Sequence, residues 1–152
     1  MRYPLLACLS LVVVLPLLGA CSGEVEDTRP GQPVKTRQAA FKDIIRSFEP
    51  MGVMLRTNAY DADKFLTLAT AVVEKREAPW AHFGPDTNYP PTKATPEVWQ
   101  QPEKFEQARQ AFITATDTLL TAAQTKDRKQ LEAPYKAAYE ACQDCHKTFK
   151  QR

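Results

Sequence analysis

The chain has 152 residues, of which 43% are hydrophobic and 25% charged, and this length fits a single globular domain. Its formal net charge is only +2, which argues against nucleic acid or an acidic surface as the main partner. With only five glycines and neither a Walker nor a dinucleotide-binding glycine pattern, the composition argues against a nucleotide-binding fold and favours helices.

Residues 1–20 have the pattern of a bacterial export signal. Arg2 supplies the charged start, residues 5–18 form a short apolar run, and Leu18-Gly19-Ala20-Cys21 resembles a lipobox. We expect cleavage before Cys21, lipidation of its thiol, and attachment to a membrane without a spanning helix. Ser22 carries no charge that would favour inner-membrane retention, so we expect the protein at the periplasmic face of the outer membrane. The alternative is a soluble secreted protein in which Cys21 is a leftover thiol.

Residues 21–33 are predicted to be the lipidated N-terminus and a flexible linker, because they combine glycines and prolines with small polar and acidic residues. A single domain, residues 34–152, follows.

Four helices are predicted in this domain from apolar residues at helical spacing. The first spans about residues 34–58, and Pro50 inside it predicts a kink or a break near Phe48. The second spans about 61–76, with Asp61 as its N-cap.

The third helix is predicted to run from Pro102 to about residue 125, and the fourth to begin after Asp127, with a bend at Pro134. One face of the fourth helix carries Leu131, Tyr135, Ala138, Cys142, Cys145 and Phe149. Between helices two and three lies a loop, residues 78–101, with five prolines, which Trp80, Phe83, Tyr89 and Trp99 are expected to hold to the domain. The sequence therefore predicts an all-α four-helix bundle.

Residues 142–146 spell C-x-x-C-H, the attachment motif of a c-type haem. On a helix, Cys142, Cys145 and His146 project to the same side, so that two thiols can form thioethers with the porphyrin and the imidazole can bind its iron. The alternative, a thioredoxin-like redox pair, belongs at a helix start after a strand, and no strand pattern precedes this motif. The sequence thus predicts one covalent haem c near one end of the bundle.

Residues 34–152 resemble the cytochrome c′ family of class II c-type cytochromes. The matching segments are Lys35-Thr36-Arg37-Gln38-Ala39-Ala40-Phe41, Pro79-Trp80 to Phe83-Gly84-Pro85, Pro96-Glu97-Val98-Trp99 and the haem motif near the C-terminus. The resemblance implies that His146 is the proximal iron ligand and that Arg37 lies near the haem propionates. It also implies that Lys150, four residues after His146 on the same helix face, lies close to the imidazole; the alternative for Lys150 is a frayed, solvated terminal lysine.

Phe41 decides the expected coordination of the iron. Low-spin relatives have a ligating methionine at this position, whereas high-spin relatives have an apolar residue that covers the distal face of the haem. The resemblance therefore implies a five-coordinate, high-spin protein that binds NO and CO and is capable of electron transfer. The alternative is a low-spin electron carrier in which Met51, Met54 or His82 supplies a sixth ligand.

No enzymatic activity is expected, because a haem peroxidase would need a distal histidine or arginine, and Arg37 is better explained by the propionates. The sequence does not identify redox partners in the periplasm. A homodimer through the first two helices is a further expectation from the resemblance.

Overall fold

The computed structural model describes residues 25–57 and 59–151. The predicted export signal and the predicted lipidation site, Cys21, lie outside the described residues. The helical elements in chain order are α1 (Pro33–Arg56), α2 (Ala62–Lys75), the short 3-10 helix η1 (Trp80–His82), α3 (Glu97–Gln100), α4 (Pro102–Gln124), the 3-10 helix η2 (Arg128–Gln130) and α5 (Glu132–Phe149).

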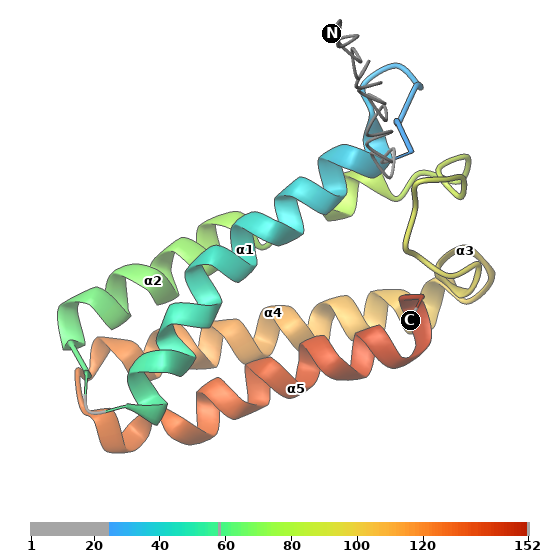
Figure 1. Ribbon diagram of the computed structural model, residues 1–152. Coiled ribbons are helices and arrows are strands. Elements are labelled where there is room, and N and C mark those ends of the chain that lie inside the picture. The colour runs from blue at the N-terminus through green and yellow to red at the C-terminus, as the bar shows by residue number, and fades with distance from the viewer. Residues whose placement is uncertain (1–24, 58, 152) are drawn as a thin grey trace, which may run out of the picture.

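The four long helices α1, α2, α4 and α5 form a four-helix bundle, as predicted (Figure 1). In the bundle α1 packs against α2, α2 against α4, and α4 against α5. Figure 1 shows α4 and α5 running side by side, whereas the first half of α1 diverges from the last half of α5. Within the described part of the chain, no helix has the length and apolar character needed to cross a membrane.

The helix ends agree with the predictions to within two residues for the first three long helices. Asp61 caps α2 as expected, by accepting a hydrogen bond from the Lys64 amide at 2.9 Å. Asp127 instead caps η2, where its carboxylate accepts from the Lys129 amide at 3.0 Å, so α5 begins only at Glu132. Pro134 therefore falls in the first turn of α5, where no backbone donor is needed and no bend is required.

Helix α1 continues through Pro50 without a break, and it changes direction along its length in Figure 1. Proline removes one backbone donor, which a helix tolerates when neighbouring packing holds its course. Here the packing is strong, because Phe48, Met51 and Leu55 on either side of Pro50 are buried in the core.

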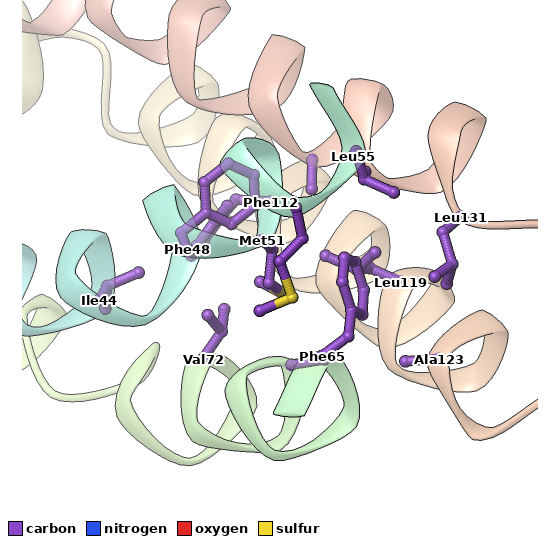
Figure 2. Close-up of a cluster of buried hydrophobic side chains, with 13 residues drawn as sticks. Ile44, Phe48, Met51, Leu55, Phe65, Val72, Phe112, Leu119, Ala123 and Leu131 are labelled. Atoms are coloured by element: carbon purple, nitrogen blue, oxygen red, sulfur yellow. The ribbon is translucent and has the colours of Figure 1, made fainter. Parts of the chain in front are cut away.

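The main core lies between α1, α2 and α4, with contributions from α5 (Figure 2). Its largest fully buried side chains include Met51, Phe65 and Leu119, each with at most 1% of its surface exposed. A second, smaller cluster lies around Ala94, Val98 and Phe149, where the long loop meets the end of α5. The two clusters divide the molecule into a central core and a loop-covered end.

Helices α1 and α5 make a close contact at Gly52. A Cβ atom built on Gly52 would lie 2.7 Å from Cζ of Tyr135, whose ring stacks on Phe48 with centroids 4.6 Å apart. Only glycine leaves room for the tyrosine ring at this position. This contact joins α1 to the first half of α5, far along the helix from the haem motif.

The prediction of a flexible linker is wrong for its second half, because residues 27–32 are held against the domain. The carboxylate of Asp27 is fully buried and accepts hydrogen bonds from the backbone amides of Val34 at 2.9 Å and Lys35 at 3.0 Å. Gln32, at the N-cap position, makes no capping bond with its side chain. Asp27, five residues before the N-cap position, therefore accepts hydrogen bonds from the free amides at the start of α1.

Candidate haem site

The three residues of the haem motif lie on the last two turns of α5. Cys142 packs against the main core and Cys145 against the smaller cluster, and both side chains are half-buried. His146 lies next to Cys145 on an exposed part of the helix. Their spacing places all three on adjacent positions of one helix surface.

The surroundings of the two thiols do not suit a redox-active cysteine pair. Burial raises the pKa of both Cys142 and Cys145 to about 11, with a smaller contribution at Cys142 from its neighbour. Redox-active thiols have a lowered pKa and are typically found at the positive N-terminal end of a helix. Here both lie near the C-terminal end of α5, which argues for attachment of a group rather than for thiol–disulfide exchange.

The imidazole of His146 is held in the form that can bind a metal. Although the residue as a whole is exposed, partial burial of the imidazole lowers the pKa of His146, and the nearby ammonium group of Lys150 lowers it further. A neutral imidazole has a free nitrogen lone pair, which is the form that ligates iron.

Lys150 is the C-cap residue of α5, which ends at Phe149, and it lies near His146: its backbone amide donates to the His146 carbonyl at 3.3 Å. Lys150 is extended and forms an isolated antiparallel bridge with Ala94 of the long loop. Beside it, the Thr95 amide donates to the Phe149 carbonyl at 3.1 Å and the Gln151 amide to the Lys93 carbonyl at 2.8 Å. The backbone of Lys150 is therefore fixed to the loop and not frayed.

Arg37 is buried, with 2% of its surface exposed, and its guanidinium group holds the long loop. One Nη donates to the His82 carbonyl and to Thr87 Oγ1, both at 2.8 Å. The other donates to the Thr87 carbonyl at 3.0 Å and to Thr92 Oγ1 at 2.6 Å. All four Nη hydrogens are thus used in holding the loop.

Phe41 belongs to a layer of aromatic rings that extends from α1 to the end of α5. Its ring meets Trp80 edge-on at 5.4 Å and Phe83 at 6.3 Å, measured between centroids. Phe83 lies 5.0 Å from Phe105, which in turn lies 5.2 Å from Phe149. The layer therefore joins the predicted distal residue to the helix end that carries the haem motif.

The residues of this end fit a covalently held porphyrin. The two half-buried thiols, one helical turn apart, face surroundings rich in aromatic side chains, which suit a large apolar ring. Within the described residues, the indole Nε1 of Trp80 is a buried donor without a hydrogen-bond partner, so the aromatic layer contains one unpaired N–H group.

The three alternative ligands lie in different places. Met51 and Met54 are buried in the main core, and Figure 2 shows Met51 among Phe65 and the other core side chains. Met51 is ten residues beyond Phe41, or about 15 Å along α1. His82 lies in η1 beside the aromatic layer, with its carbonyl bound to Arg37. Of the three, His82 is the one near the haem end.

The sequence did not indicate the partners of Arg37 or the burial of Asp27. Thr87 and Thr92 look like ordinary loop residues, and their contacts with Arg37 span 50 and 55 positions. The available signal that the segment is packed and not free was its four aromatic residues, Trp80, Phe83, Tyr89 and Trp99.

Comparison with known proteins agrees with this geometry. A family model described as Cytochrome C' matches residues 32–150. The cytochrome c' of Rubrivivax gelatinosus is 32% identical over 126 residues, which cover 82% of this chain and 98% of that protein. That of Alcaligenes xylosoxydans is 30% identical over 125 residues, covering 82% of this chain and 97% of the relative.

Solved structures show the same relationship. The Rubrivivax gelatinosus structure superposes with a TM-score of 0.77 at 31% identity, covering 83% of this chain and all of the other. Cytochrome c prime from Shewanella frigidimarina superposes with a TM-score of 0.78 at 28% identity, covering 82% of this chain and 98% of the other. Leucine variants of the Alcaligenes xylosoxidans protein have been solved with nitric oxide and with carbon monoxide bound. The chain therefore belongs to the cytochrome c′ family, whose members carry one covalently bound haem c.

Proposed function

We propose that Cys142 and Cys145 attach the haem, that His146 ligates its iron, and that the protein is a five-coordinate haem protein that binds NO and CO. The observation that carries this proposal is the position of Phe41. Its ring, which has no ligating atom, is packed edge-on against Trp80 in the aromatic layer at the haem end.

An apolar distal side favours small uncharged ligands, and NO and CO are uncharged diatomics. Complexes of the Alcaligenes relative with both gases support the same ligand class here. A peroxidase role gains no support, because the Arg37 side chain is engaged with the loop and has no free fork of donors for O–O cleavage.

The first test is spectroscopic. We expect the purified ferric protein to give high-spin optical and EPR spectra, and the ferrous protein to change its spectrum on addition of CO or NO. A low-spin spectrum that CO does not change would overturn five-coordination and favour the electron-carrier alternative. In that case the His82→Ala variant identifies the sixth ligand, because it alone would convert the spectrum to high spin if His82 ligates.

The second test concerns entry of the ligand. Phe41 makes two aromatic contacts, each contributing about 0.5–1.5 kcal/mol, and the ring must leave them to admit a ligand. Losing that barrier in Phe41→Ala should speed CO association about 5- to 150-fold by stopped-flow, since about 1.4 kcal/mol is tenfold in rate. Phe41→Leu, which keeps an apolar cover, is the matched control and should lie between the two. Equal rates for wild type and Phe41→Ala would refute the role of Phe41 as a cover.

We propose further that the mature protein is periplasmic and attached by lipid on Cys21, preferentially to the outer membrane. The support is the Leu18-Gly19-Ala20-Cys21 sequence and the absence of a charge at Ser22. Incorporation of labelled palmitate that is lost in Cys21→Ala is the expected result. Labelling that persists in this variant would place the lipid elsewhere.

A homodimer through α1 is also proposed, since Ile45 and Val53 are large apolar residues that are 45% and 49% exposed. They lie eight positions apart, within one broad face of a helix. Sedimentation velocity should give a dimer for the wild type and a monomer for Ile45→Glu/Val53→Glu. A wild-type monomer at micromolar concentration would exclude this assembly.

A further inference from the structure

The segment of residues 27–32, here called the strap, is fixed to the haem end of the bundle by two charged side chains. The buried Asp27 carboxylate accepts a hydrogen bond from the hydroxyl of Tyr89 at 2.6 Å, in addition to its bonds from the start of α1. Arg29 donates to the Asp86 carbonyl at 2.6 Å and lies over the ring of Tyr89, 4.0 Å from its centroid. Both side chains thus bind the loop between α2 and α4.

The same loop covers the haem end. Arg37 binds it from α1, and the backbone next to Lys150 binds it from the end of α5. In Figure 1 the start of the described chain, in blue, lies beside this loop and at the end of the molecule where α5 finishes. The strap therefore joins the bundle at the haem end and not at the opposite end, where α1 meets α2.

Chain length limits how far this end can lie from the proposed lipid. Asp27 is six positions after Cys21, and a fully extended chain over that distance spans about 20 Å. From the start of α1, Phe41 is about 12 Å along the helix, whereas the far end at Arg56 is about 35 Å away, at 1.5 Å per residue. A lipid at Cys21 would therefore hold the haem end close to the bilayer and the far end well away from it.

We propose that a lipid bilayer is the surface that the haem end faces, and that the strap fixes this orientation. The inference rests on the proposed lipidation of Cys21 and adds the direction in which the domain stands. Val25, between the lipid and the strap, is an apolar side chain with 58% of its surface exposed, which suits contact with the membrane interface. Ligands or electrons that reach the haem from the membrane would then meet the near end of the protein.

The test compares two sites on the lipidated holoprotein bound to phosphatidylethanolamine/phosphatidylglycerol vesicles. Lys93, in the loop at the haem end, and Lys129, in η2 at the far end, are both exposed and are replaced by Cys and spin-labelled in turn. The relaxation rate of each spin label is measured on vesicles with and without nickel-chelating headgroups. The difference between the two rates is the part caused by nickel at the bilayer surface, free of the contribution from haem iron. We expect nickel to enhance the relaxation rate of the label at position 93 at least severalfold more than that of the label at position 129.

Two controls separate the orientation from the anchor. Co-flotation of the protein with vesicles, lost in Cys21→Ala, tests the anchor. Protein that floats but shows equal or reversed enhancement overturns the orientation alone, whereas protein that does not float overturns both. Inserting about 20 Gly/Ser residues after Ser22 keeps the strap contacts but raises the r.m.s. end-to-end distance of the tether to roughly 25 Å or more. This variant should float and lose most of the difference between the two sites; an unchanged difference would also overturn the proposal.

Discussion

Replacing Arg37 with Met should destabilise the haem end by several kcal/mol. Thr87 Oγ1 would still donate to the Gly84 carbonyl and Thr92 Oγ1 would still accept from the Ala94 amide. The carbonyls of His82 and Thr87 would lose their charged donors. A hydrogen bond to a charged group contributes about 1.5–3 kcal/mol, so the loss of two of them amounts to about 3–6 kcal/mol.

Urea denaturation of the holoprotein, followed by far-UV circular dichroism, measures this loss as a lower midpoint at unchanged slope. Arg37→Lys is the matched control: it keeps the charge but lacks the planar fork, so it should recover only part of the stability. Hydrogen exchange should show that the loss is centred on residues 79–100, with the Met51 core still protected. A free energy of unfolding for Arg37→Met within about 0.5 kcal/mol of wild type would refute the assignment of Arg37 as the main support of the loop.

Three further variants test other parts of the structure. Gly52→Ala should gain about 1 kcal/mol of helix propensity but lose about 1–3 kcal/mol by displacing the stacked Tyr135 ring, so the expected net result is a lower melting temperature; an increase would contradict the close contact. At Asp27, burial acts to raise the pKa, but hydrogen bonds from Tyr89 and three backbone amides outweigh it and hold the pKa below its usual 3.8. The ionised carboxylate therefore stabilises the fold above about pH 4 and loses this effect as the pH falls through the lowered pKa. The Asp27→Asn variant should be less stable than the wild type at pH 7 and approach its stability in acid. A difference in stability that stays constant across this pH range would count against the role of the Asp27 carboxylate. Met51→Leu, a volume-conserving change, should cost less than about 1.5 kcal/mol and leave the ferric EPR spectrum unchanged, whereas an altered spin state would show that Met51 reaches the iron.

The sequence predicted the bundle because its main determinants are local and periodic. Apolar residues at steps of three and four placed Phe112 and Leu119 of α4, Leu131 immediately before α5, and Ala138 of α5 on one buried side, and all four are buried. The haem motif was equally readable, since its three functional residues lie within five positions of one helix. Such features need no knowledge of distant contacts.

What the sequence could not predict depends on pairs of residues far apart in the chain. The hydrogen-bond partners of Arg37 lie 45 to 55 positions away in a loop without a regular pattern, so nothing in the sequence indicated that this side chain holds the loop. Asp27 was placed in a flexible linker because its neighbours are glycine, proline and polar residues. The composition of a segment indicates its backbone flexibility, but it does not predict that one of its carboxylates is buried and caps a helix.

The length of the loop between α2 and α4 follows from these contacts. A short turn would suffice to join two antiparallel helices, and a long loop in a compact domain needs a function. Here the first half of α1 and the last half of α5 diverge (Figure 1), and the Trp80 and Phe83 rings from the loop pack against Phe41 of α1 and cover the haem end. The loop provides that cover, and its order depends on two buried charged groups, the Arg37 guanidinium and the Asp27 carboxylate. Because one comes from α1 and the other from the strap, the surroundings of the haem and the attachment of the N-terminus are parts of a single packed unit.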